Sequence, residues 1–150
     1  METVTFPEKE VVGFISGEVI PLRVAHDQKP LSEDFNVKWT PTLVILDGEG
    51  REHHRTVGFL PPEEFMASVL LGIGKMHFDN EAFEKAVGVL SRVMDEFPGT
   101  GSAPEAVFVK AVAQFKLEKN PSSLKEAWRL LSEKYPESEW AKRALPYRLL

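Results

Sequence analysis

Two adjacent histidines, His53 and His54, are the side chains of this sequence most readily associated with metal binding. They lie in a polar, alternating stretch that we expect to form a strand, and neighbouring side chains on a strand point to opposite faces. They therefore cannot easily bind one ion. His26 and His77 lie on other segments without ligand spacing. We interpret these residues as surface histidines and predict neither a metal site nor a cofactor.

The other residue types that perform catalysis are absent or lack a suitable context. The chain contains no cysteine, which excludes a thiol nucleophile, a disulfide and cysteine-ligated zinc. The serines lie in no nucleophile-elbow motif. Residues 47–50, Asp-Gly-Glu-Gly, lack the following helix and the lysine of a phosphate-binding loop. We therefore predict no catalytic residue in this chain and favour a protein that is not an enzyme.

Composition limits the classes of partner. The chain has 150 residues, a net charge of −5 and a pI near 5.4, with basic residues scattered among acidic ones. A surface of this kind does not favour nucleic acid. No apolar stretch reaches the roughly 18–20 residues that span a bilayer, so we expect no membrane segment. No signal peptide is visible at the N-terminus, and the expected location is therefore the cytoplasm.

The first half of the sequence predicts alternating helices and strands. Thr5 and Glu8 form a capping-box pattern before a helix that Gly17 can close. Residues 19–25 and 42–46 are expected strands, with a short helix over 30–35 between them. Asp47-Gly48 predicts a hairpin turn into a polar strand over about 51–57. A further helix starts at Pro61-Pro62, and Gly72 and Gly74 are expected to weaken its end.

The second half predicts helices alone. Four helices are expected, over about 83–97, 104–117, 123–135 and 138–149, and the second should be central because it is apolar on nearly every side. Residues 86–91 match residues 127–132, and Phe97-Pro98-Gly99-Thr100 matches Tyr135-Pro136-Glu137-Ser138. This internal repeat resembles tetratricopeptide-type helical hairpins, of which a free-standing array needs about three.

The first half also resembles the second half of a thioredoxin fold. The residues that carry the likeness are Thr5-Phe6-Pro7, Val11-Val12, Phe14-Ile15, the segment 19–24, Phe35-Asn36-Val37-Lys38-Trp39-Thr40-Pro41-Thr42-Leu43-Val44 and Gly58-Phe59. The expected fold is therefore a thioredoxin-like α/β domain over residues 1–75, followed by an all-α tetratricopeptide-like region over residues 76–150. This combination is known among bacterial thioredoxin-like proteins.

The resemblance implies a peptide-binding site at Trp39, Thr40 and Pro41. In the family, the loop before a cis-proline offers backbone groups to an extended peptide. The alternative is that Pro41 merely begins a strand, and we expect the cis form. Trp39 is either an exposed aromatic used in recognition or a side chain packed against a neighbouring helix.

The family's central strand and its Cys-x-x-Cys motif would precede Met1. Either the reading frame was assigned from an internal methionine, or the chain is genuinely shortened and lacks the central strand. In the second case, residues 19–25 should pair directly with residues 42–46, or a homodimer should complete the sheet. Leaving the gap open is disfavoured, because an unpaired buried backbone group costs about 1–3 kcal/mol.

Three functions follow from these expectations. The first is a redox-inactive thioredoxin-like protein that binds a protein partner or an unfolded client, in protein–protein interaction or as a chaperone-like accessory. The second is a fragment of a thiol–disulfide oxidoreductase whose Cys-x-x-Cys segment lies upstream. The third is a structural subunit that associates with itself through a sheet edge.

Overall fold

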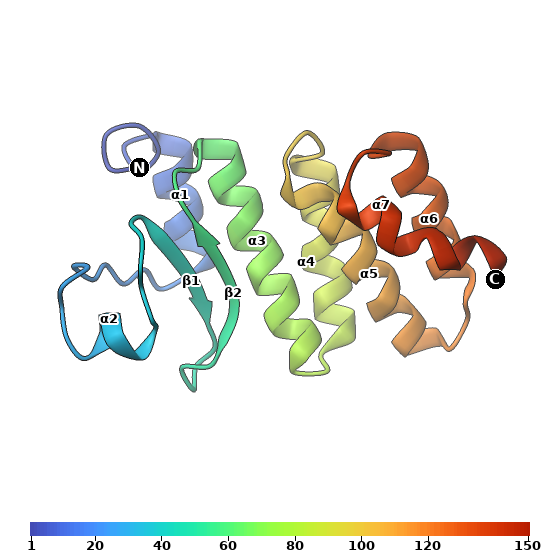
Figure 1. Ribbon diagram of the computed structural model, residues 1–150, viewed down its shortest axis with the longest axis horizontal. Helices are drawn as coiled ribbons and strands as arrows, with labels where there is room; N and C mark the ends of the chain where they lie inside the picture. Colours follow the sequence, from blue (N-terminus) through green and yellow to red (C-terminus); the bar gives the residue numbers. More distant parts are fainter.

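The computed structural model describes residues 1–150 as a row of helices with a small sheet at one end (Figure 1). The elements are α1 (Lys9–Glu18), α2 (Leu31–Asp34), β1 (Thr42–Leu46), β2 (Glu52–Val57), α3 (Pro62–Asp79), α4 (Phe83–Glu96), α5 (Ser102–Glu118), α6 (Ser122–Lys134), α7 (Glu139–Ala144) and a 3-10 helix η1 (Leu145–Leu149). None of the helices combines the length and apolarity that crossing a membrane requires.

Helix α3 is the shared element between the two halves of the molecule. It contacts β1 and β2 on one side and α4 and α5 on the other (Figure 1). Nine of its residues between Phe65 and Gly74 are buried, as is typical of a helix enclosed by neighbours. The expected weakening at Gly72 and Gly74 was wrong, because both glycines lie inside the helix, where neighbouring side chains approach closely.

The sheet contains two strands, and one expected strand is missing from it. β1 and β2 pair antiparallel. Residues 19–25 have no regular secondary structure, and Ile20 and Leu22 are 98% and 79% exposed. The expected strand and its direct pairing with β1 were therefore wrong. An isolated strand is not stable by itself, because its backbone groups need partners and its apolar side chains need a surface to cover.

Helix starts agree only in part with the capping patterns of the sequence. Thr5 does not cap α1; it is fully buried, and its Oγ1 donates to the backbone oxygen of Leu60 at 2.6 Å. Ser123 likewise does not cap α6, and its Oγ donates to the backbone oxygen of Ala111. Ser138 does cap α7, accepting from the backbone N–H of Ala141 at 3.1 Å. Side-chain oxygens thus bind whichever donor or acceptor the tertiary structure brings closest.

The two helical hairpins, α4–α5 and α6–α7, repeat each other in detail. Phe97 and Tyr135 end α4 and α6 with nearly the same backbone angles (φ −132°, ψ 47° and φ −134°, ψ 49°). Their N–H groups donate to the backbone oxygens of Val93 and Leu131, respectively. Val93 and Leu131 are therefore equivalent. The sequence match of 86–91 with 127–132 is displaced from this equivalence by about one helical turn.

The start of the second helix in each hairpin is also repeated. Thr100 and Ser138 each donate a side-chain hydrogen bond of 2.8 Å to the backbone oxygen three residues earlier. The small residues that follow are buried in both hairpins: Ala103 and Ala106 in one, Ala141 and Ala144 in the other. Small side chains at these positions let paired helices approach closely. As expected, α5 is a central helix, in contact with α3, α4, α6 and α7.

Candidate functional site

The expected site at Trp39, Thr40 and Pro41 lies in the connection between α2 and β1. The Thr40–Pro41 peptide bond is cis. Two hydrogen bonds hold the loop: Thr42 Oγ1 donates to the backbone oxygen of Trp39 at 2.5 Å, and Gly58 N donates to the backbone oxygen of Pro41 at 2.8 Å. Gly58 has a φ of +105°, a conformation that favours glycine. The loop is therefore fixed to the end of β2.

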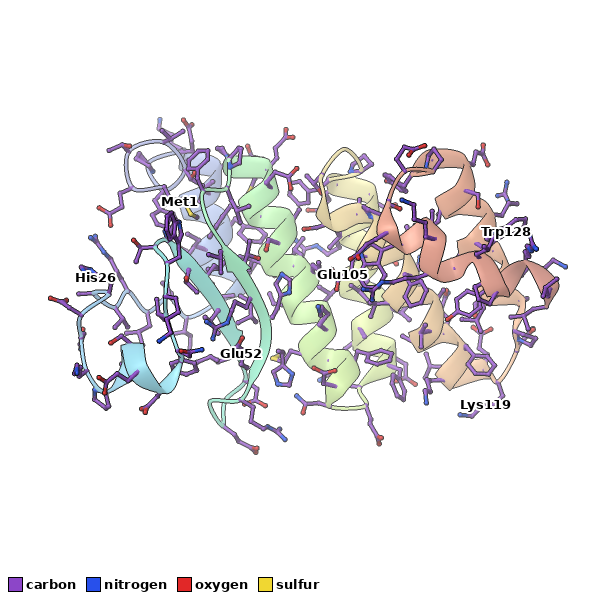
Figure 2. All side chains as sticks on the ribbon, viewed as in Figure 1. Met1, His26, Glu52, Glu105, Lys119 and Trp128 are labelled. Atoms are coloured by element: carbon purple, nitrogen blue, oxygen red, sulfur yellow. The ribbon has the colours of Figure 1, made fainter.

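Trp39 presents its ring to solvent, with 68% of the residue exposed. Trp39 and Lys38 together line two open hollows. The first hollow also contains His26, which lies in the loop at the opposite end of the molecule from Trp128 (Figure 2). The second contains Arg55, whose guanidinium binds Glu52 and the backbone oxygen of Phe35. Trp39 is thus available to a partner rather than packed beneath a helix.

One edge of β1 has no partner strand. The register of the hairpin and the bond from Gly58 to Pro41 direct the backbone groups of Leu43 and Ile45 toward β2. The N–H and C=O of Val44 consequently point away from β2, and no backbone hydrogen bond joins them to another segment. Figure 1 shows β1 on the side of β2 that faces away from the helical hairpins. An open edge of this kind is a template for another strand.

A β-bulge determines where His53 points. Ile45 pairs with His54 and Leu46 pairs with Glu52, so that His53 has no opposite residue on β1. The His53 ring lies between two carboxylates: Nδ1 is 2.7 Å from Asp79 Oδ2, and Nε2 is 3.0 Å from Asp47 Oδ2. The side chain is only 6% exposed. The interpretation of His53 as a surface histidine was therefore wrong.

His54 is also not a surface residue. Its Nε2 lies 3.3 Å from Ser68 Oγ and 3.3 Å from Thr56 Oγ1, in a partly buried polar cluster between β2 and α3. The pKa of His54 is lowered, first by burial and then by the positive charge of Lys75. The two histidines do not share a ligand, because they contact α3 at residues far apart on that helix. No group of three or more histidine, cysteine, aspartate or glutamate side chains is placed to hold a metal ion.

The electrostatics of the Asp47–His53–Asp79 cluster favour charged forms. Hydrogen bonds to Asp47 and then to Asp79 raise the pKa of His53 above 6.5. The pKa of Asp47 is held well below its usual range by the hydrogen bond from His53 and by the backbone N–H of Arg51. Both ring nitrogens of His53 are occupied, so neither is free to act as a base or to bind a ligand. The cluster therefore has a structural role.

The first half of the chain, which contains the loop and the sheet, is similar to a known protein family. Residues 1–70 match the family model of the thioredoxin-like domain. Comparison with curated proteins and with solved structures gave no match. The thioredoxin-like likeness predicted from the sequence is thereby confirmed for a range that includes α1, both strands and the Trp39 loop. Helices α4 to α7 lie outside the matched range.

Within residues 1–70, the structure places side by side some residues whose proximity was not predicted from the sequence. The loop at Trp39, Thr40 and Pro41 runs directly into β1, whose edge at Val44 is unpaired. Sequence reasoning missed the cluster of His53 with Asp47 and Asp79. The Asp-Gly turn was visible, but the bulge that turns His53 toward it depends on strand register and leaves no local signal.

Proposed function

We propose that this chain is a redox-inactive protein-binding module, acting in protein–protein interaction or as a chaperone-like accessory. In this proposal, residues 1–75 form a thioredoxin-like segment that binds the partner, and residues 76–150 form tetratricopeptide-like hairpins. The observation that carries it is the continuity between an exposed aromatic loop, centred on Trp39, and the unpaired edge of β1. Exposed main chain and an aromatic side chain are the two elements of strand-addition binding.

Binding would use the backbone first and side chains second. An extended segment of the partner would hydrogen-bond to the N–H and C=O of Val44, which point away from β2. An apolar or aromatic side chain of that segment would lie against Trp39, which is 68% exposed. Because main-chain bonds do not depend on side-chain identity, this mode suits an unfolded client as well as a defined partner.

The helical hairpins would provide a rigid base for the binding segment. Lys75 of α3 binds Glu105 of α5 at 2.7 Å, and Glu105 lies in the middle of the molecule (Figure 2). Arg92 of α4 binds Glu18 of α1 at 2.9 Å. Two hairpins are fewer than a free-standing array needs, and their docking on α3 supplies the apolar contact that a third would give.

The test is binding to a labelled protein that stays unfolded, such as reduced and carboxymethylated lactalbumin. Trp39→Ala should weaken binding about tenfold or more, because truncating a central aromatic typically costs about 2 kcal/mol or more. Val44→Pro should do the same by removing the outward N–H without breaking the β1–β2 ladder. Leu149→Ala, at a residue 80% exposed on η1, is the matched control and should bind normally.

The results of this binding experiment distinguish binding at β1 from the absence of binding. Loss in both loop and edge variants, with unchanged circular dichroism and a normal Leu149→Ala control, supports binding at β1. A chain that binds no unfolded protein and does not slow the aggregation of one contradicts the proposed function.

A second copy of the chain is a further partner in this proposal. Pairing of two β1 edges would form a homodimer that completes the sheet and satisfies Val44 in both copies. Analytical ultracentrifugation over a range of concentrations should then show a dimer that Val44→Pro dissociates. A monomer at all concentrations would remove the homodimer and leave binding to other proteins.

A second candidate function is part of a thiol–disulfide oxidoreductase whose Cys-x-x-Cys segment is encoded upstream. Two observations favour it: Ile20 and Leu22 are exposed, and the outer edge of β1 has no partner. A further strand paired with β1 would fill that edge and could cover such apolar side chains. In-frame upstream codons for an apolar strand and Cys-x-x-Cys would support this candidate, and a nearby in-frame stop codon would refute it. The chain of residues 1–150 should show no turnover in insulin reduction, because it holds no thiol.

A further inference from the structure

The turn of the β1–β2 hairpin is joined to the end of α3 by the side chain of His53. Asp47 begins the turn and Asp79 is the last residue of α3. These two residues are far apart in the sequence, and the imidazole ring is the bridge between them. The side chains of His53 and Asp47 are only 6% and 8% exposed, whereas Asp79 is 51% exposed, so water reaches the Asp79 contact more readily than the Asp47 contact.

The geometry of this bridge requires one protonation state of the ring. Both neighbours of His53 are carboxylate oxygens, which accept hydrogen bonds when ionised, and a neutral imidazole has only one N–H to donate. Only the doubly protonated ring satisfies both contacts. After loss of a proton, one ring nitrogen would direct its lone pair at a carboxylate oxygen 2.7 or 3.0 Å away, so that contact must separate.

We propose that His53 is a proton-operated clasp, which fastens the hairpin turn to the end of α3 while the ring carries two protons and loosens when it loses one. The raised pKa of His53 extends the closed state to higher pH than an ordinary histidine would allow, and the loosened state lies above that range. The inference is independent of the proposed binding function, because it concerns only how two elements of the fold are joined.

The charged groups around His53 determine how far the clasp can open. Arg51, on the turn, binds Asp47 Oδ2 at 2.8 Å and Glu49 at 3.2 Å, and also donates to Asn80 Oδ1 beside the end of α3 at 3.1 Å. The arginine stays charged at all accessible pH values. It therefore keeps a second link between the same two elements. Deprotonation of His53 should loosen the turn rather than detach it.

The remaining neighbours do not oppose the cation. On its own strand, Glu52 is bound to Arg55, and His54 lies against Ser68 on a separate part of α3. Asp79 is 51% exposed, and it can be changed without opening a buried cavity. Asp79 is therefore the place to test the clasp without unfolding the protein.

The His53 clasp lies next to the connection between α3 and α4, which leads from the sheet to the helical hairpins. Asp79 and Asn80 lead directly into Glu81 and Ala82 and then α4, and the turn joins β1 to β2. Amide hydrogen exchange can follow both sides of the clasp: the N–H of Gly50 binds the backbone oxygen of Asp47, and the N–H of Asn80 binds that of Met76. These amides should lose protection together when His53 deprotonates.

The experiment combines a ring titration with hydrogen exchange on the complete chain. Nitrogen chemical shifts of His53 should show both ring nitrogens protonated at pH 6, and protection at Gly50 and Asn80, corrected for intrinsic rates, should fall at least about threefold as the ring titrates. Asp79→Asn should move the titration of His53 to lower pH. His53→Gln should remove the pH dependence of protection, whereas His26→Gln, at an exposed loop histidine, should leave it unchanged.

Three results would overturn the proposal. One is a His53 ring that titrates at or below the ordinary histidine value. The second is protection at Gly50 and Asn80 that does not change as the ring titrates. The third is the same pH dependence in His53→Gln as in the unaltered chain. If His53→Gln does not fold, the shift expected in Asp79→Asn decides the question, because its absence shows that Asp79 does not stabilise the protonated ring.

Discussion

Gly72 of α3 lies so close to Ile45 of β1 that a Cβ atom on Gly72 would come within 2.5 Å of Ile45 Cγ1. The same atom would lie 3.0 Å from the Cβ of His54. Neither neighbour is the free end of a flexible side chain, so the sheet and the helix would have to move apart. The glycine therefore sets the distance between α3 and the sheet that supports the candidate site.

We expect Gly72→Ala to destabilise the protein by about 1–3 kcal/mol. Alanine favours a helix over glycine by roughly 1 kcal/mol, but overpacking a close contact costs about 1–3 kcal/mol, occasionally more, and here two strands must shift. Urea unfolding followed by circular dichroism measures the change in the free energy of unfolding. The control is Gly88→Ala in α4, where nothing lies within 4 Å of the new Cβ.

Gly88→Ala should stabilise the protein by up to about 1 kcal/mol, through helix propensity alone. Opposite signs for the two substitutions would show that packing, not backbone entropy, decides the outcome at Gly72. Equal stabilisation by both would contradict the close contact between α3 and β1.

Acid should destabilise the protein through Asp47. Its folded pKa is depressed, so its contribution is fully present above the unfolded value, near 3.8, and is lost as pH falls through the folded value. The urea concentration at the unfolding midpoint of the unaltered chain should therefore decrease when the pH is lowered below about 4. Asp47→Asn should make that decrease smaller. Glu137→Gln, a surface acid that makes no salt bridge, is the control. An acid dependence that Asp47→Asn leaves intact would assign the effect to other carboxylates.

Much of this fold could be predicted from short sequence motifs, because all the residues that determine such a turn or helix end lie next to each other in the sequence. The Asp47-Gly48 turn, the Pro98-Gly99 stop after α4 and the Pro62 start of α3 each combine a conformational preference with an adjacent apolar pattern. The equivalence of Phe97 and Tyr135 was also visible, since an aromatic-proline pair ends each helix in the same way.

The errors arose where a residue's state depends on a distant partner. Residues 19–25 have strand-forming side chains, but a strand exists only when another strand pairs with it. Thr5 has the side chain of a cap and instead binds Leu60. His53 is the extra residue of a bulge that only the register of β1 and β2 creates. Its carboxylate partners come from two other elements, and no spacing in the sequence relates them.

Ser138→Ala should destabilise the protein by about 0.5–2 kcal/mol. Ser138 is the one helix-capping side chain of α7, accepting from Ala141 N and donating to the backbone oxygen of Tyr135, and loss of a cap typically costs about 1 kcal/mol. The control is Ser122→Ala at the start of α6, where the hydroxyl caps nothing. Thermal unfolding should separate the two variants. A similar small effect for both would mean that the Ser138 cap contributes little.

The ion pair between Lys75 and Glu105 should couple α3 to α5 more strongly than a surface pair does. The two side chains are 29% and 18% exposed and 2.7 Å apart, so water screens their attraction less. A double-mutant cycle with Lys75→Met and Glu105→Gln should give a coupling energy of about 1 kcal/mol or more. The matched control is Arg143 with Glu139 in α7, 57% and 64% exposed. Exposed pairs of this helical spacing typically give about 0.3–0.5 kcal/mol. The pair links α3, which begins within the matched range, to α5 of the hairpins. Equal coupling in both cycles would mean that this ion pair joins the two helices no more strongly than an exposed pair does.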